Sequence, residues 1–142
     1  MIKIFSRISP EKLLHIVCSH SMRNQKNQRV DIVPEDNFIQ CAFLNMEKGK
    51  TFPPHKHIKK ERLYKEKIAQ ESWVILKGSV KFIFYDLDDS PLGTLILKQG
   101  DASFTLEGGH TYEILEDDTL VYEYKTGPYE GQENDKVFLE KK

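Results

Sequence analysis

His55 and His57 are two positions apart, the spacing that places two side chains on the same face of a strand. Two imidazoles held in this way can bind one metal ion from neighbouring positions. The same spacing also occurs by chance in exposed segments that bind nothing. The pair therefore indicates a metal site only if further ligands come from elsewhere in the chain.

Glu71 and His110 are the candidates for those further ligands. Three imidazoles and one carboxylate form a ligand set that iron, manganese, zinc and nickel all accept, and it leaves positions open for water or substrate. Because histidine must be neutral and the carboxylate ionised, we expect the metal affinity to fall at low pH. The ligand set identifies a divalent first-row transition metal without choosing among these elements.

Short strands must position these residues. Apolar and β-branched runs alternate with turn signals over 38–46, 73–76, 79–87, 92–98, 102–106, 111–115 and 119–125. Seven or more short strands at this spacing predict a sandwich or barrel. Strands and helices do not alternate along the chain, which argues against a doubly wound α/β fold.

The beginning of the chain predicts a short helix. Ser9 is typical of an N-cap, Pro10 of a first helical position, and Leu13, Leu14, Val17 and Cys18 then share one helical face. We expect this helix to end between residues 21 and 24. The sequence thus predicts one domain over 1–142, with a helix and loop in 1–33, a sandwich or β-barrel in 38–125 and a polar tail in 126–142.

Two segments resemble the motifs of the cupin superfamily. Gly49 is followed after five residues by His55 and His57, and Glu71 is followed after six residues by Gly78; Gly100 then precedes a Gly108-Gly109 turn and His110. The resemblance spans residues 49 to about 114. It implies a mainly β protein, a cupin jelly-roll barrel (a double-stranded β-helix) with a metal ion held by His55, His57, Glu71 and His110.

A narrower resemblance, to the WbuC-like group of small cupin-fold metalloproteins, covers nearly the whole chain. Its marks are Arg23, Asn24, Gln40, Asn45, Pro54, Gly127, Pro128, Tyr129, Asp135 and Lys136. The resemblance implies a role in bacterial surface-polysaccharide biosynthesis, acting on a sugar or nucleotide sugar. It implies no particular reaction, so a metal-dependent isomerase, epimerase or oxygenase, a non-catalytic sugar-binding module and a metal-free nucleotide-sugar isomerase all stay open.

The spacer between His57 and Glu71 is longer than in the usual cupin motif. Glu61 would satisfy the shorter spacing and competes for the role of acidic ligand. We favour Glu71 because an apolar strand follows it, whereas Glu61 lies within a charged run. The inserted residues 58–70 form either a lid over the barrel or an exposed insertion.

Three residues are candidates for the lining of a pocket: Gln40, Trp73 and Tyr112. Tyr112 shares the strand face of His110, because it lies two positions later. Tyr112 and Glu107 are candidate general bases through their nearness to His110. Gln40 and Asn45 are an odd number of positions apart, so a regular strand directs at most one of them into a barrel.

Composition narrows the function further. The 142 residues carry a net charge of −1, which argues against a nucleic-acid binder, although the basic stretch within 48–67 suits either a solvated face or an anionic ligand. No apolar run reaches the length of about 20 residues that spans a membrane. Two cysteines form no disulfide framework, which favours a reducing cytoplasm. Cupin barrels often pair, so we expect a homodimer.

Overall fold

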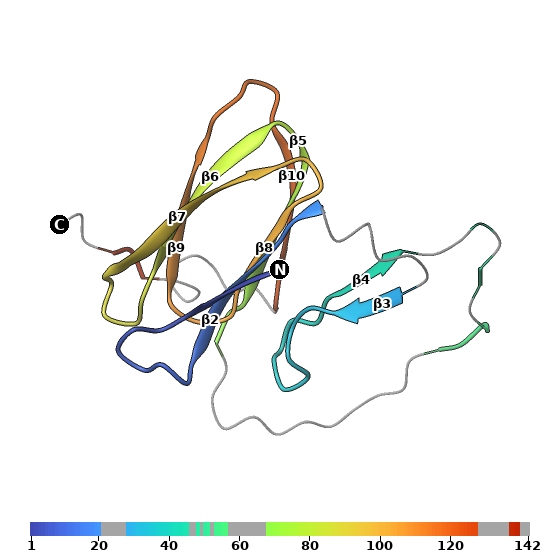
Figure 1. Ribbon diagram of the computed structural model, residues 1–142, viewed down its shortest axis with the longest axis horizontal. Helices are drawn as coiled ribbons and strands as arrows, with labels where there is room; N and C mark the ends of the chain where they lie inside the picture. The colour runs from blue at the N-terminus through green and yellow to red at the C-terminus, as the bar shows by residue number, and fades with distance from the viewer. Residues whose placement is uncertain are drawn as a thin grey trace.

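The computed structural model describes residues 1–20, 28–45, 48, 50–51, 53–56, 68–127 and 137–139 (Figure 1). The described chain is mainly β-structure, with almost no helix, and every strand pair in it is antiparallel. Its strands are β1 (Ile2–Phe5), β2 (Leu13–Cys18), β3 (Gln28–Asp31), β4 (Ala42–Asn45), β5 (Glu71–Lys77), β6 (Ser79–Tyr85), β7 (Pro91–Lys98), β8 (Ala102–Thr105), β9 (Gly109–Ile114) and β10 (Leu120–Lys125). The expectation of a mainly β protein is confirmed.

Two of the sheets face each other as a β-sandwich. The larger sheet has the order β1-β2-β8-β5-β10 and the smaller has the order β7-β6-β9. The inner core between them contains Val17, Trp73 and Ile75 from the larger sheet and Val80, Phe82, Phe84 and Leu97 from the smaller. All seven side chains are at most 6% exposed, so most of the space between the sheets is dry.

A third, two-stranded sheet of β3 and β4 packs on the outer face of the larger sheet (Figure 1). Ile32 and Val33 form an outer core there with Ile16 and Phe104. The buried Gln70, which immediately precedes β5, ties the loop between β3 and β4 to the larger sheet. Its Oε1 accepts a hydrogen bond from the Ile39 amide at 2.9 Å. The strands β2 and β8 are therefore covered on both faces.

The strands expected from residue 73 onward are confirmed as β5 to β10, with ends that differ by one or two residues. The turn expected over 88–91 is also confirmed, since the Asp86 amide donates to the Ser90 carbonyl at 2.8 Å. Of the strand expected over 38–46, residues Ala42–Asn45 form β4, while the preceding residues belong to the loop that Gln70 holds.

The expected N-terminal helix is wrong. Leu13–Cys18 form β2, and the Lys12 amide donates to the Ser9 carbonyl in a turn where the helix was expected to begin. The physical reason is that alternate residues of this run enter different cores: Val17 packs in the inner core, and Ile16 and Cys18 pack in the outer core. An apolar run buried on both sides suits a central strand, whereas the helical stripe would fill one side.

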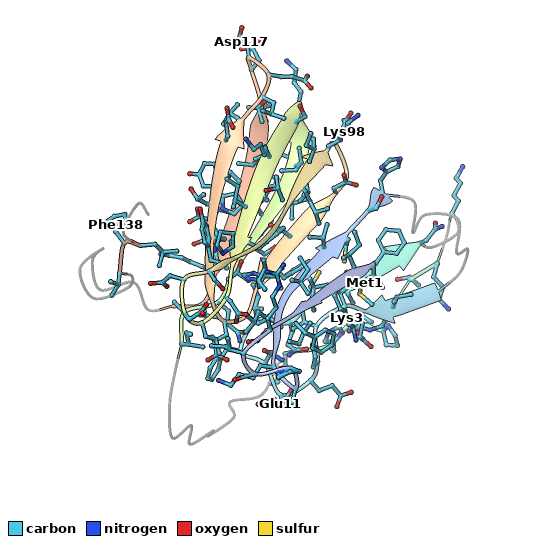
Figure 2. All side chains as sticks on the ribbon, turned by 60° about the vertical axis from the view of Figure 1, so that its left-hand side comes forward. Met1, Lys3, Glu11, Lys98, Asp117 and Phe138 are labelled. Carbon is cyan, nitrogen blue, oxygen red and sulfur yellow. The ribbon has the colours of Figure 1, made fainter. Side chains whose placement is uncertain are left out.

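Within the residues that the structure describes, no helix has the length and hydropathy needed to cross a membrane. The sandwich has two distinguishable ends. Figure 2 shows Asp117, in the turn between β9 and β10, at one end, and Glu11, in the loop between β1 and β2, at the other. Strand β5 begins at Glu71 and pairs there with the last residue of β10, so the candidate ligands lie toward the Glu11 end.

Candidate metal centre

Glu71 and His110 meet between the two sheets although 39 positions separate them in the sequence. Glu71 opens β5 of the larger sheet, and His110 is the second residue of β9 in the smaller one. His110 Nε2 lies 3.1 Å from Glu71 Oε1, and the two side chains are 22% and 15% exposed. The sequence placed both residues in one site, and the structure brings them into contact; metal binding by them stays a prediction.

Trp73 holds the same carboxylate oxygen. Its indole Nε1 donates a hydrogen bond to Glu71 Oε1 at 3.0 Å, and Trp73 is 6% exposed. A buried indole N–H needs an acceptor, and here the acceptor is the oxygen that also meets His110. The orientation of the Glu71 carboxylate is thus fixed by a side chain whose own ring is locked in the inner core.

The Tyr112 ring packs on Trp73 beside the Glu71–His110 pair and forms an aromatic wall of the site. Its ring centroid lies 3.8 Å from that of Trp73, and Tyr112 remains 44% exposed. Burial raises the pKa of the Tyr112 phenol, and the carboxylates of Glu123 and Glu71 raise it further. The phenol is therefore neutral near pH 7, and one part of the ring is accessible next to the Glu71–His110 pair.

One row of side chains runs across the larger sheet through this site. His15, Thr105, Glu71 and Lys125 are direct cross-strand neighbours on β2, β8, β5 and β10. Directly opposite residues in an antiparallel pair share a face, with Cβ atoms about 4.5–5.5 Å apart. The row therefore places Lys125 beside Glu71, and the same register places Glu123 beside Trp73.

Lys125 and Glu123 are site residues that the sequence interpretation missed. The alternation of residues 120–125 predicts that Val121, Glu123 and Lys125 share one strand face. That pattern is visible in the sequence. It does not say which strand lies next to β10, and that pairing is what brings the two charged residues to Glu71 and Trp73.

His15, at the other end of the row, is fully buried. Its Nε2 lies 3.2 Å from the Tyr85 carbonyl and its Nδ1 lies 3.2 Å from the Thr105 hydroxyl. Burial lowers the pKa of His15 to about 4, a shift that the bond to Tyr85 and the charge of Asp86 oppose and that His110 reinforces. At neutral pH this imidazole is uncharged, and both of its nitrogens have partners.

Asp86 closes the sandwich beside His15. Its carboxylate accepts hydrogen bonds of 2.6 Å from the Ser6 hydroxyl and from the Arg7 amide, which ties the loop between β1 and β2 to the turn after β6. Burial by itself would raise the pKa of Asp86, and the hydrogen bonds from Ser6, Arg7 and Leu87 outweigh it and hold that pKa below its ordinary value. Around His15, this end of the sandwich is therefore closed by hydrogen bonds.

His55 is exposed, and its Nδ1 lies 3.0 Å from the Pro53 carbonyl. Within the described ranges, no three His, Cys, Asp or Glu side chains form a group that could hold a metal ion. The structure therefore joins Glu71 and His110 without His55. Several predicted residues lie outside the described residues, namely His57, Glu61 and most of the insertion 58–70, together with Arg23, Asn24, Gly49, Pro128, Tyr129, Asp135 and Lys136.

Gln40 lies in the loop between β3 and β4, and its role as a pocket residue stays a prediction. Its side chain is exposed, and its amide nitrogen donates to the carbonyls of Pro34 at 3.0 Å and Asn37 at 2.8 Å. Gln40 thus stabilises the loop between β3 and β4. Glu107, expected near His110, forms a 2.9 Å ion pair with Lys12.

Comparison of the chain with protein-family models, with curated proteins and with solved structures found no match. The cupin resemblance therefore rests on the motifs, and the candidate site rests on the geometry above.

Proposed function

We propose that this protein is a cupin-type metalloprotein that binds one divalent first-row transition metal through Glu71 and His110, with His55 and His57 as the remaining ligands. The observation that carries the proposal is the contact of Glu71 Oε1 with His110 Nε2 at 3.1 Å, formed from opposite sheets. Two ligand types that the sequence singles out, far apart in the chain, meet at one point.

The separation of these two atoms fits adjacent ligands of a single ion. Metal–ligand bonds to imidazole nitrogen and carboxylate oxygen are about 2.0–2.1 Å long, which puts neighbouring ligand atoms roughly 3.0–3.4 Å apart in tetrahedral or octahedral sites. The donor set of one carboxylate and imidazoles suits iron, manganese, zinc or nickel. A carboxylate held by a buried indole N–H also has the supporting hydrogen bond that metal ligands usually have.

The strand order supports the cupin jelly roll as the architecture of this site. Strands β5, β8 and β10 belong to the larger sheet, and β6, β7 and β9 belong to the smaller. The chain thus passes back and forth between two facing sheets, with β10-β5-β8 and β9-β6-β7 as neighbours. This is the order of six successive strands in an eight-stranded jelly roll, the architecture to which cupins belong.

For the ligand we propose a sugar or nucleotide sugar in bacterial surface-polysaccharide biosynthesis. A bound divalent ion would supply Lewis-acid polarisation of a carbonyl or activation of a water. Trp73 would orient Glu71, and the half-exposed Tyr112 ring would offer an apolar surface beside polar groups, the combination typical of small-molecule sites. The homodimer and the cytoplasmic location expected from the sequence stay predictions.

The test is the metal content of protein purified without chelator or metal-affinity resin. We expect near one equivalent of one metal in the wild type and its loss in Glu71→Gln and His110→Ala. Glu113→Gln and His20→Ala are matched controls, since Glu113 pairs with Lys81 on the outer face and His20 pairs with Asp101. A wild type that stays metal-free after reconstitution, or variants that keep the metal, would overturn the proposal.

A second candidate is a metal-free nucleotide-sugar isomerase or epimerase, in which His110 is the general base. The direct contact of His110 with Glu71 favours it, because a carboxylate that orients an imidazole is a common arrangement in acid–base catalysis. Proton exchange between solvent deuterium and a nucleotide sugar would then continue after chelation. The third candidate, a binding module, would return its ligand unchanged from purification.

A further inference from the structure

Lys125 lies next to Glu71 at the open end of the row, and its place is fixed by the strand register. Thr126 and Gln70 lock the two strands together just beyond the Lys125–Glu71 pair. The Thr126 amide donates to the Gln70 carbonyl at 3.0 Å, and the Gln70 amide donates to the Thr126 hydroxyl at 3.0 Å. Gln70 is buried, and these two hydrogen bonds fix the backbone next to Lys125 beside β5.

We propose that Lys125 is an anion-binding residue of this site and recognises an anionic group, a phosphate or a carboxylate, on the small-molecule ligand. The inference rests on the proposed metal centre. Glu71 and Glu123 bring two negative charges to this surface and Lys125 brings one positive charge. A divalent ion would reverse the balance and leave an anion-attracting centre beside the lysine.

The geometry supplies a place for the rest of the ligand. The Tyr112 ring packs on Trp73 and is 44% exposed, and the cross-strand neighbour of Trp73 is Glu123, two positions before Lys125. A ligand with its anionic group at Lys125 would extend along β10 over this aromatic wall. An ammonium group has three N–H donors, so Lys125 can bind an anion and keep a second partner.

Trp73 is the chain's one tryptophan, and it contacts both Glu71 and Tyr112, so its fluorescence reports on this site alone. We would titrate the metal-loaded full chain with inorganic phosphate, and separately with acetate, at constant ionic strength. The two titrations separate a phosphate site from a carboxylate site. We expect a saturable change in emission with one of the two anions.

The decisive variants are Lys125→Met, Lys125→Gln and Lys125→Arg. Losing a charged hydrogen bond should weaken anion affinity at least about tenfold in the first two, whereas arginine should keep it within about threefold. Lys81→Met is the matched control, because Lys81 is paired with Glu113 at 2.8 Å and the alternation of β6 puts it on the outer face. Near-wild-type unfolding temperatures would show that the variants fold.

Metal content measured on the same samples separates this inference from the metal proposal. Anion binding lost in Lys125→Met with its metal retained supports the lysine's role. A metal-free wild type that binds phosphate only when Lys125 is present would also support it, and would overturn the metal centre alone. Equal affinity in wild type and Lys125→Met, no saturable change with either anion, or loss of the metal in Lys125→Met would overturn the anion-binding role.

Discussion

The two halves of one row across the larger sheet have opposite characters. In the closed half, His15 is fully buried and its nitrogens face two neutral partners, the Thr105 hydroxyl and the Tyr85 carbonyl. In the open half, Glu71 meets His110 at 3.1 Å, with both side chains partly exposed. A buried histidine is structural in the first half, and a partly exposed histidine has a charged neighbour in the second.

The contrast arises from what covers each half. The loop between β1 and β2 is tied by Asp86 over the end where His15 lies, and β2 and β8 are packed on both faces. Strand β10 is an edge of the larger sheet in the described part of the chain, and Tyr112 beside it is 44% exposed. Chemistry on a soluble ligand is therefore expected at the Glu71 half, and the His15 half should govern stability.

The largest expected effect is a loss of stability on substitution of Phe84, which lies between the His15 half and the Glu71 half of the row. Phe84 packs against His15 with ring centroids 4.8 Å apart, is the cross-strand neighbour of His110, and is fully buried. Phe84→Ala should lower the free energy of unfolding by about 3–5 kcal/mol in urea titrations. Phe138→Ala is the matched control: Phe138 is 73% exposed and stands at the edge of the molecule in Figure 2, so its effect should stay within about 0.5 kcal/mol. Equal losses of unfolding free energy in the two variants would show that Phe84 is not part of a tightly packed core between the two halves.

The next effect is a pH dependence that belongs to the closed half. The pKa of His15 is lowered from 6.5 to about 4 by burial, so below pH 6.5 the unfolded chain binds a proton that the folded chain refuses. The stability is fully present above pH 6.5, and about 3 kcal/mol of it should be lost between pH 6.5 and 4. Asp86 raises the pKa of this imidazole and His110 lowers it.

His15→Gln removes that titration while keeping hydrogen-bonding groups at the position. The free energy of unfolding of wild type and variant, measured in urea from pH 7 to 4, should converge as the pH falls. A wild type whose loss on acidification matches that of the variant would show that His15 is not responsible. The comparison uses the slope with pH, so a lower stability of the variant at neutral pH does not affect it.

The fold was predictable where local pattern and tertiary environment agree. Residues 120–125 alternate and form β10 as expected, since one face of that strand packs inward and the other is exposed. Residues 13–18 misled the prediction, because an apolar run without alternation satisfies a helical stripe and a doubly covered strand equally well. What decided between them was the outer core that β3 and β4 supply, and no local signal announces that core.

The site residues, too, were predictable where a local motif marks them and unpredictable where tertiary contacts decide. The spacing of Glu71 and His110 in a motif pointed to one site, and these two residues do meet. Lys125 was missed because its place depends on the pairing of β10 with β5, which joins segments about 50 positions apart. The pocket role of Gln40 stays a prediction; carbonyls in its own loop accept hydrogen bonds from its amide, contacts that side-chain type alone does not reveal.

A smaller effect, on metal affinity, is expected from substitution of Trp73, the residue that orients the Glu71 carboxylate. Trp73→Phe keeps an aromatic ring in the core and removes the N–H that holds Glu71 Oε1. Loss of such a supporting hydrogen bond should weaken metal affinity by about 10–100-fold, measured by competition with a chelator. Tyr122→Phe, on the exposed outer face of β10, should leave the affinity unchanged. Unchanged affinity in Trp73→Phe would mean that Glu71 needs no support from the indole.

The smallest expected effect is a loss of unfolding free energy on substitution of Thr105, with Thr111 as the comparison. Thr105 is 8% exposed and its hydroxyl contacts His15 Nδ1, whereas Thr111 lies exposed on β9. Valine has nearly the same shape, so Thr105→Val removes chiefly the hydrogen bond and leaves a buried imidazole nitrogen without its partner. The cost should be about 1–2 kcal/mol of unfolding free energy, against less than about 0.5 kcal/mol for Thr111→Val. If both substitutions cost the same, then the closed half draws its stability from packing, and the hydrogen bonds of His15 add nothing to the contrast with Glu71.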